Sequence, residues 1–183
     1  FDDASNSWSL AGELGFGIDA PGANLNLKLD SKGRPYVAVI GYAENSSLEG
    51  SSAVHVFRLD DSGEHFEAVG PPCGVDDRVI TSDEAGYREI AALALDGNDV
   101  PHVAYRGRDR NGKVCVRRYD ATIDEWLPVG ALGFSPGRGV EAEDDYISLE
   151  FQGLMPVVAF RHGCSAGNAC DPPNSTLQVW AWY

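Results

Sequence analysis

The chain repeats one series of short segments three times, and the series begins and ends out of frame. Equivalent third segments lie at 54–60, 114–120 and 177–183. A fourth segment that ends in glycine follows the first two, at 65–70 and 125–130, and its remaining copy is at the N-terminus, at 7–12. A repeat of this length determines the architecture before any single residue does.

The second unit predicts four strands most clearly. Ile90 to Leu95 is a short apolar run, followed by a tight-turn sequence at Asp96 to Asp99. A second strand begins at Pro101, where a missing N–H is tolerated. Strands rich in β-forming residues follow at 114–119 and 126–130. The unit therefore predicts a four-stranded antiparallel meander.

Applied to the whole chain, this pattern predicts an all-β fold of three four-stranded antiparallel meanders in one domain, 1–183. Repeat one covers 25–70, repeat two covers 90–130, and an incomplete repeat three covers 147–183. The displaced fourth strand, 7–12, is expected to complete the third repeat of the same chain or of a neighbouring one. No segment longer than a turn or two has a helical period.

Charge and composition exclude some partners. The net charge is −14 over 183 residues, and nucleic-acid binders need a basic face. The same charge argues against anionic membrane surfaces. No run of about 18 apolar residues is present, so we expect no membrane insertion.

Cysteines and glycosylation sequences predict a secreted or cell-surface protein. Asn45 and Asn174 begin Asn-x-Ser/Thr sequences in expected loops. A disulfide between Cys164 and Cys170 would close a short polar loop, and Cys73 and Cys115 could form a second bridge, although spacing leaves the connectivity open. Zinc is the alternative for four thiols, but no Cys-x-x-Cys spacing supports it.

The motifs resemble a known repeat. Leu95-Asp96, Pro101 to Tyr105, Tyr119-Asp120 and Trp126 to Gly130 are similar to the blade repeat of secreted bacterial and algal proteins, which reads approximately S-L-A-x-D, P-Y-V-A-Y, Y-D, W-x-x-V-G. The resemblance covers nearly the whole chain and implies β-propeller blades, with no particular activity. Closed propellers have four to eight blades, so three are too few for the usual ring.

The displaced strand leads to our first functional hypothesis, a non-enzymatic extracellular structural protein. A strand donated from one copy to the next would give a head-to-tail homo-oligomer or polymer, with a filament as one product. It would also cover the edge of the third repeat. The residues expected to form this contact are Trp8, Leu10, Gly12, Leu177, Val179, Trp180 and Trp182.

Two other functions stay open. A carbohydrate- or partner-binding module would use aromatic residues for glycan contacts, with Tyr87, Tyr146 and Trp182 as candidates. A glycosidase would need two carboxylates beside the scissile bond, but the abundance of acidic residues here does not single out a pair. No Gly-x-Ser-x-Gly nucleophile motif is present, and we predict no catalytic residues.

Metal and cofactor sites have little support in the sequence. The four histidines, His55, His65, His102 and His162, share no metal-ligand spacing. The acidic residues Glu141, Glu143, Asp144 and Asp145 offer oxygen ligands for calcium, but they lack an EF-hand register. A solvated acidic loop is the favoured interpretation, and no cofactor is expected.

Overall fold

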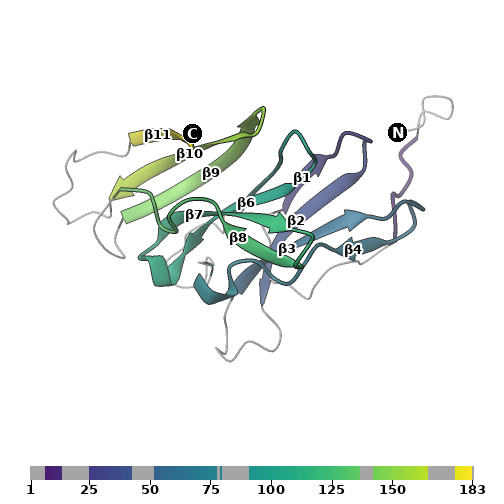
Figure 1. The fold of residues 1–183 in the computed structure, drawn as a ribbon, viewed down its shortest axis with the longest axis horizontal. Helices are drawn as coiled ribbons and strands as arrows, with labels where there is room; N and C mark the ends of the chain where they lie inside the picture. Colours follow the sequence, from purple (N-terminus) through teal and green to yellow (C-terminus); the bar gives the residue numbers. More distant parts are fainter. Residues whose placement is uncertain are drawn as a thin grey trace.

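The computed structural model describes residues 7–13, 25–42, 52–77, 79, 91–136, 142–164 and 176–182. These residues form an all-β fold with two 3₁₀ turns, η1 (Val75–Asp77) and η3 (Arg108–Arg110) (Figure 1). No helix among them is long and apolar enough to cross a membrane. The strands are β1 (Leu25–Leu29), β2 (Pro35–Tyr42), β3 (Ser52–Leu59), β4 (Phe66–Ala68), β5 (Ala91–Leu95), β6 (Pro101–Gly107), β7 (Lys113–Asp120), β8 (Glu125–Pro128), β9 (Ala142–Gln152), β10 (Met155–Cys164) and β11 (Thr176–Ala181).

The strands form three antiparallel sheets that follow the sequence repeat. The first sheet has the order β1-β2-β3-β4 and the second β5-β6-β7-β8. The third has three strands in the order β11-β10-β9, so β11 is an edge strand in the described structure. The predicted all-β class and the antiparallel strands are confirmed, as is the shorter third unit.

Aspartates close the turns between the first two strands of the repeats. The buried carboxylate of Asp30 accepts hydrogen bonds from the backbone N–H of Lys32 and of Arg34, at 2.9 and 2.8 Å. Asp96 accepts the equivalent bonds from Asn98 and Val100 in the second sheet. These are Asx turns, in which a short carboxylate replaces a backbone acceptor, and they explain why Asp recurs after the first strand.

The sheets pack face to face. One apolar cluster lies between the first and second sheets, with Ile40 and Val54 on one side and Leu93 and Tyr105 on the other. A second cluster joins the second sheet to the third. It contains Ala92, Ala94, Ala104, Val114, Val116, Ile147, Leu149, Val158 and Phe160. Since burying a large aliphatic or aromatic side chain contributes about 1.5–3 kcal/mol, these two layers hold the sheets together.

The N-terminal segment does not complete the third sheet of its own chain. Gly12 lies against Phe66 and Leu59 of the first sheet: a Cβ added to it would be 2.9 Å from Phe66 Cδ2. The segment therefore lies beside the first sheet, on the opposite side of the molecule from β11 (Figure 1). The possibility of closure within one chain is thus wrong. Trp8 is 85% exposed, so its indole is not buried within the chain.

Candidate functional site

A row of exposed side chains on β9 is the first candidate site. Along this strand Ile147 and Leu149 point into the core, at 8% and 2% exposure, while Tyr146, Ser148 and Glu150 are exposed. The alternation follows from the two-residue period of a strand. It places a ring, a hydroxyl and a carboxylate on one face, about 7 Å apart along the strand.

Tyr146 has an unusual backbone. Its φ is +56°, in the left-handed region that non-glycine residues seldom adopt. The register between β9 and β10 explains this conformation: Ala159 lies opposite Ser148, but Arg161 lies opposite Asp145. The extra residue of β9 is accommodated by a β-bulge, which re-aims a side chain at that point. Strained residues of this kind cluster at binding and catalytic sites.

Charged groups flank the two ends of this row. The Arg161 guanidinium lies 5.1 Å from the centroid of the Tyr146 ring, within the range of a cation–π contact. The Glu150 carboxylate accepts a hydrogen bond from the Lys28 ammonium of β1. The Lys28–Glu150 pair therefore connects the first and third sheets at the surface, and Arg161 and Lys28 place positive charge beside the ring and the carboxylate.

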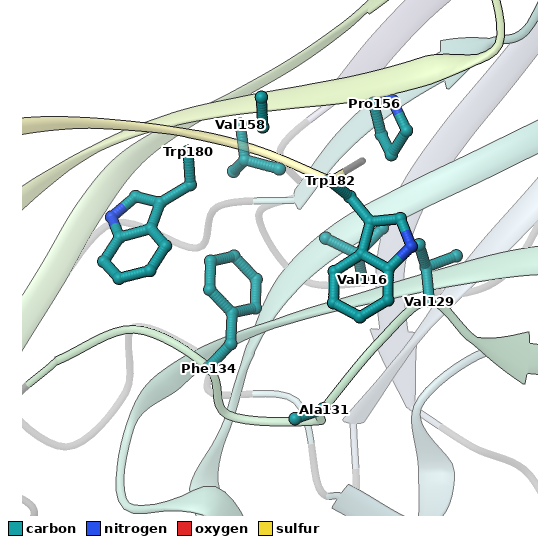
Figure 2. Close-up of a pocket in the computed structure, with 9 residues that line it drawn as sticks. Val116, Val129, Ala131, Phe134, Pro156, Val158, Trp180 and Trp182 are labelled. Atoms are coloured by element: carbon teal, nitrogen blue, oxygen red, sulfur yellow. The ribbon is translucent and has the colours of Figure 1, made fainter.

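An apolar pocket between the second and third sheets is the second candidate. Its volume is about 290 Å³. Figure 2 shows Trp180 of β11 and Trp182, the residue after β11, with Phe134 between their rings; Val116 of β7 and Val129 also line the pocket. The rings of Phe134 and Trp180 are 5.8 Å apart between centroids. Trp180 and Trp182 are 42% and 57% exposed, which leaves both indoles accessible at the opening.

A buried polar network is the third feature. Asp77 of η1 is fully buried and accepts hydrogen bonds from Tyr105 Oη at 2.6 Å and from Arg110 and Arg117 at 2.7 and 2.8 Å. Burial raises the pKa of Asp77, but these hydrogen bonds outweigh it and hold the pKa below its usual range. Burial also raises the pKa of Tyr105 well above its ordinary value, so its phenol remains a donor. The network fixes η1 to the second sheet.

The two cysteines beside this network are not bridged. Cys73 and Cys115 are both buried and free, so the predicted second disulfide is wrong in this structure. Burial raises the pKa of the Cys115 thiol to about 11 and that of Cys73 further, which makes both thiols unreactive. They belong to the apolar cluster between the first two sheets, where a free Cys packs as a small apolar residue.

Within one chain, the assembly residues expected from the sequence do not come together. Trp8, Leu10 and Gly12 lie at the first sheet, whereas Leu177 and Val179 are exposed on β11 and Trp180 and Trp182 line the pocket. Asn45, Asn174, Tyr87, Cys170 and Glu141 lie outside the described residues. For Glu143, Asp144, Asp145, His162 and Cys164 only the backbone is described, in β9 and β10.

Metal ligands do not gather in the part of the chain where side chains are described. That part holds no group of three or more His, Cys, Asp or Glu residues able to bind a metal ion. His102 is buried, with Nδ1 3.0 Å from the carbonyl oxygen of Val100 and its ring 4.5 Å from that of Phe151. His102 therefore packs between the second and third sheets.

Sequence analysis missed Ser148, Glu150 and the Asp77 network. The segment from Tyr146 to Glu150 alternates exposed and apolar residues, a pattern that could have identified the row on β9. The sequence did not single out Asp77, because nothing in its neighbours indicates burial. The two arginines that pair with it are far away in the sequence.

Comparison with family models and with curated proteins finds no match. Among solved structures, the chain is similar to a thermostable family-43 glycoside hydrolase, with 10% identity, a TM-score of 0.49, and coverage of 87% of this chain and 54% of the other. It is also similar to an endo-1,4-beta-xylanase from Bacteroides thetaiotaomicron, with 14% identity, a TM-score of 0.45, and coverage of 86% and 58%. The chain thus spans just over half the length of each.

These neighbours correct the functional expectation. Both are named as enzymes that act on glycosides, whereas the sequence led us to expect a non-enzymatic structural protein that polymerises head to tail. Neither that function nor the expectation that the chain is not an enzyme is kept. At 10% and 14% identity, the likeness concerns the arrangement of the sheets and nothing finer.

Proposed function

We propose that the chain is a β-propeller-type domain of a glycoside-acting protein, and that the exposed row on β9 contacts the glycan. The observation that carries this proposal is the left-handed conformation of Tyr146 at the bulge, which presents its ring beside Ser148 and Glu150. The three sheets, which follow the sequence repeat and pack face to face, are interpreted as three blades.

The chemistry of the row fits a sugar ring. An exposed aromatic ring offers an apolar face for the C–H face of a pyranose, and Tyr146 is 56% exposed. Ser148 offers a donor and acceptor, and Glu150 offers acceptors for sugar hydroxyls. The Arg161 guanidinium next to the ring adds donors at the same end of the row.

Distance argues against a catalytic role for Glu150 together with Asp145. Glycosidases place their two carboxyl groups about 5–9.5 Å apart. Asp145 and Glu150 are both on β9, and five residues of an extended strand span about 17 Å. Asp145 and Glu150 therefore do not form a catalytic pair. We propose that the exposed row on β9 binds the glycan.

The test is titration with glycans in solution. The panel includes β-1,4-xylo-oligosaccharides, because one structural neighbour is named as a xylanase, together with arabino-, manno- and cello-oligosaccharides. We expect at least one to bind, and Tyr146→Ala to weaken that binding about tenfold, equivalent to about 1.4 kcal/mol. Trp8→Ala is the matched control, since Trp8 is an exposed aromatic on the first sheet's side. Equal losses in both variants, or no binding by the native chain, would refute the proposal.

A further inference from the structure

The junctions between neighbouring sheets are built from equivalent residues. In β7, Tyr119 follows Arg118, which pairs with His102. Trp182 directly follows Ala181, the last residue of β11, which pairs with Val157. His102 and Val157 each follow the proline of the second strand in their repeat. Tyr119 and Trp182 therefore occupy the same position of the second and third sheets.

Both rings pack on a glycine of the preceding sheet. A Cβ added to Gly70 would lie 2.5 Å from Tyr119 Cε2, and one added to Gly130 would lie 2.5 Å from Trp182 Cζ3. Both glycines have a φ of +68°. The two junctions thus have the same geometry at this point, with a glycine under an aromatic ring of the next sheet.

At the first junction a tryptophan fills the space beside this contact. Trp126 comes from β8, the fourth strand, and its ring centroid is 5.4 Å from that of Tyr119. The side chain is 6% exposed, and its Nε1–H donates to the carbonyl oxygen of Pro71 at 2.9 Å. Pro71 is the residue after Gly70. The fourth strand is therefore anchored to the preceding sheet by one indole.

At the second junction the apolar pocket takes the place of this indole. Ala131, which follows Gly130 as Pro71 follows Gly70, lines it, and so does Trp182. Figure 2 shows Ala131 and Trp182 facing each other across the pocket, with Val129 beside them. In the described structure β11 pairs only with β10, so the third sheet has no fourth strand there to provide a counterpart of Trp126.

From this correspondence we infer that the edge of β11 and the adjoining pocket form a docking site for a tryptophan-bearing β-strand of a partner polypeptide. The strand pairs antiparallel with β11, as β8 pairs with β7, and its tryptophan lies opposite Trp182, as Trp126 lies opposite Tyr119. The indole enters the pocket and donates its N–H to the carbonyl oxygen of Ala131. Strand addition at an open sheet edge gives affinity through the backbone, and the pocket gives specificity.

The pocket selects a large apolar ring. Phe134, Val116 and Val158 form its walls, and a charged side chain there would lose its hydration without a partner. A small side chain would leave most of the approximately 290 Å³ unfilled. A tryptophan both fills the space and supplies one N–H that can donate to the Ala131 carbonyl oxygen.

The first test uses peptides. A fluorescein-labelled peptide with the sequence of residues 123–130 carries a tryptophan in the required setting, and a second peptide has alanine in its place. Fluorescence anisotropy with the whole chain should give binding of the first at least tenfold tighter than of the second. Ala131→Phe, which occupies the pocket, should reduce binding by a similar factor, whereas Leu154→Ala, at an exposed turn, should not. Equal binding of both peptides would overturn the inference.

A second test attaches the strand covalently to the chain. It does not depend on the affinity of a free peptide or on the folding of the Ala131→Phe variant. The sequence of residues 120–130 is appended after Tyr183, with residues 1–183 unchanged. The melting temperature should rise by several degrees, and alanine in place of the appended tryptophan should remove most of the rise. If the two extended chains melt at the same temperature, the pocket does not receive the indole and the inference fails.

Discussion

Gly70 and Gly63 have similar backbone conformations, with φ of +68° and +75°, but their surroundings differ. A Cβ on Gly70 would collide with the Tyr119 ring at 2.5 Å, whereas nothing lies within 4 Å of one on Gly63. The comparison separates two reasons why a position in this chain requires glycine. One is backbone conformation, which both share, and the other is close packing between sheets, which only Gly70 has.

Gly70→Ala should therefore destabilise the chain more than Gly63→Ala. We expect Gly63→Ala to cost about 1 kcal/mol, the price of a left-handed conformation for a side chain with Cβ. Gly70→Ala should cost about 2–4 kcal/mol, because overpacking adds about 1–3 kcal/mol to the same backbone term. Urea unfolding of both variants measures the difference. Equal values would mean that the glycine under the ring has no packing role.

His102 should make stability depend on pH. Its burial lowers its pKa from 6.5, although the Val100 carbonyl and nearby Asp96 oppose the shift and Arg118 adds to it. The folded chain therefore binds fewer protons than the unfolded one below about pH 6.5, so stability should fall as the pH decreases from there. The contribution of one such group is at most about 1.4 kcal/mol per pH unit. His102→Gln should reduce the slope of unfolding free energy between pH 6.5 and 5, and an unchanged slope would contradict this.

At the scale of elements, η1 is attached to the second sheet by the carboxylate of Asp77. Arg117 of β7 donates both to this carboxylate and to the Tyr105 hydroxyl, at 2.8 Å each, and Arg110 of η3 donates to the other carboxylate oxygen. Buried charge pairs contribute little net stability when intact, but removing one member leaves the rest uncompensated. The network thus fixes the position of η1 against β6 and β7.

Asp77→Asn should cost about 3–5 kcal/mol in the free energy of unfolding, because Arg117 would stay buried without its counter-charge. Glu67→Gln is the matched control. Glu67 forms an exposed pair with Arg58 at 3.6 Å, and exposed pairs contribute little. Chemical unfolding followed by tryptophan fluorescence measures both variants. A loss for Asp77→Asn as small as that of the control would show that the buried pairs are dispensable.

The strands could be predicted because each depends on local sequence. The third strands expected at 54–60, 114–120 and 177–183 correspond to β3, β7 and β11 within one or two residues. The bulge at Tyr146 could not be predicted, since it depends on the register between β9 and β10. The location of the N-terminal segment could not be predicted either, because a segment that runs from Trp to Gly fits beside any open sheet. Only the contact of Gly12 with Phe66 shows that this segment lies at the first sheet.

At the scale of the whole molecule, face-to-face packing separates the candidate sites. The exposed row on β9 alternates with Ile147 and Leu149, which pack toward the second sheet, so the row faces away from that sheet. Trp180 and Trp182 line the pocket on the side of the second sheet. A ligand at one site therefore contacts different strands and residues from a ligand at the other. Because the two sites are separate, the proposed function can be tested by which residues a glycan contacts as well as by how tightly the glycan binds.

The most direct test is to map glycan binding residue by residue. Backbone amide resonances of the ¹⁵N-labelled chain are followed by NMR during titration with the oligosaccharide that binds. We predict that the largest shifts fall on Tyr146, Ser148, Glu150 and Arg161, and that they disappear in Tyr146→Ala. Largest shifts at Phe134, Trp180 and Trp182, or no shifts with any glycan of the panel, would contradict the account.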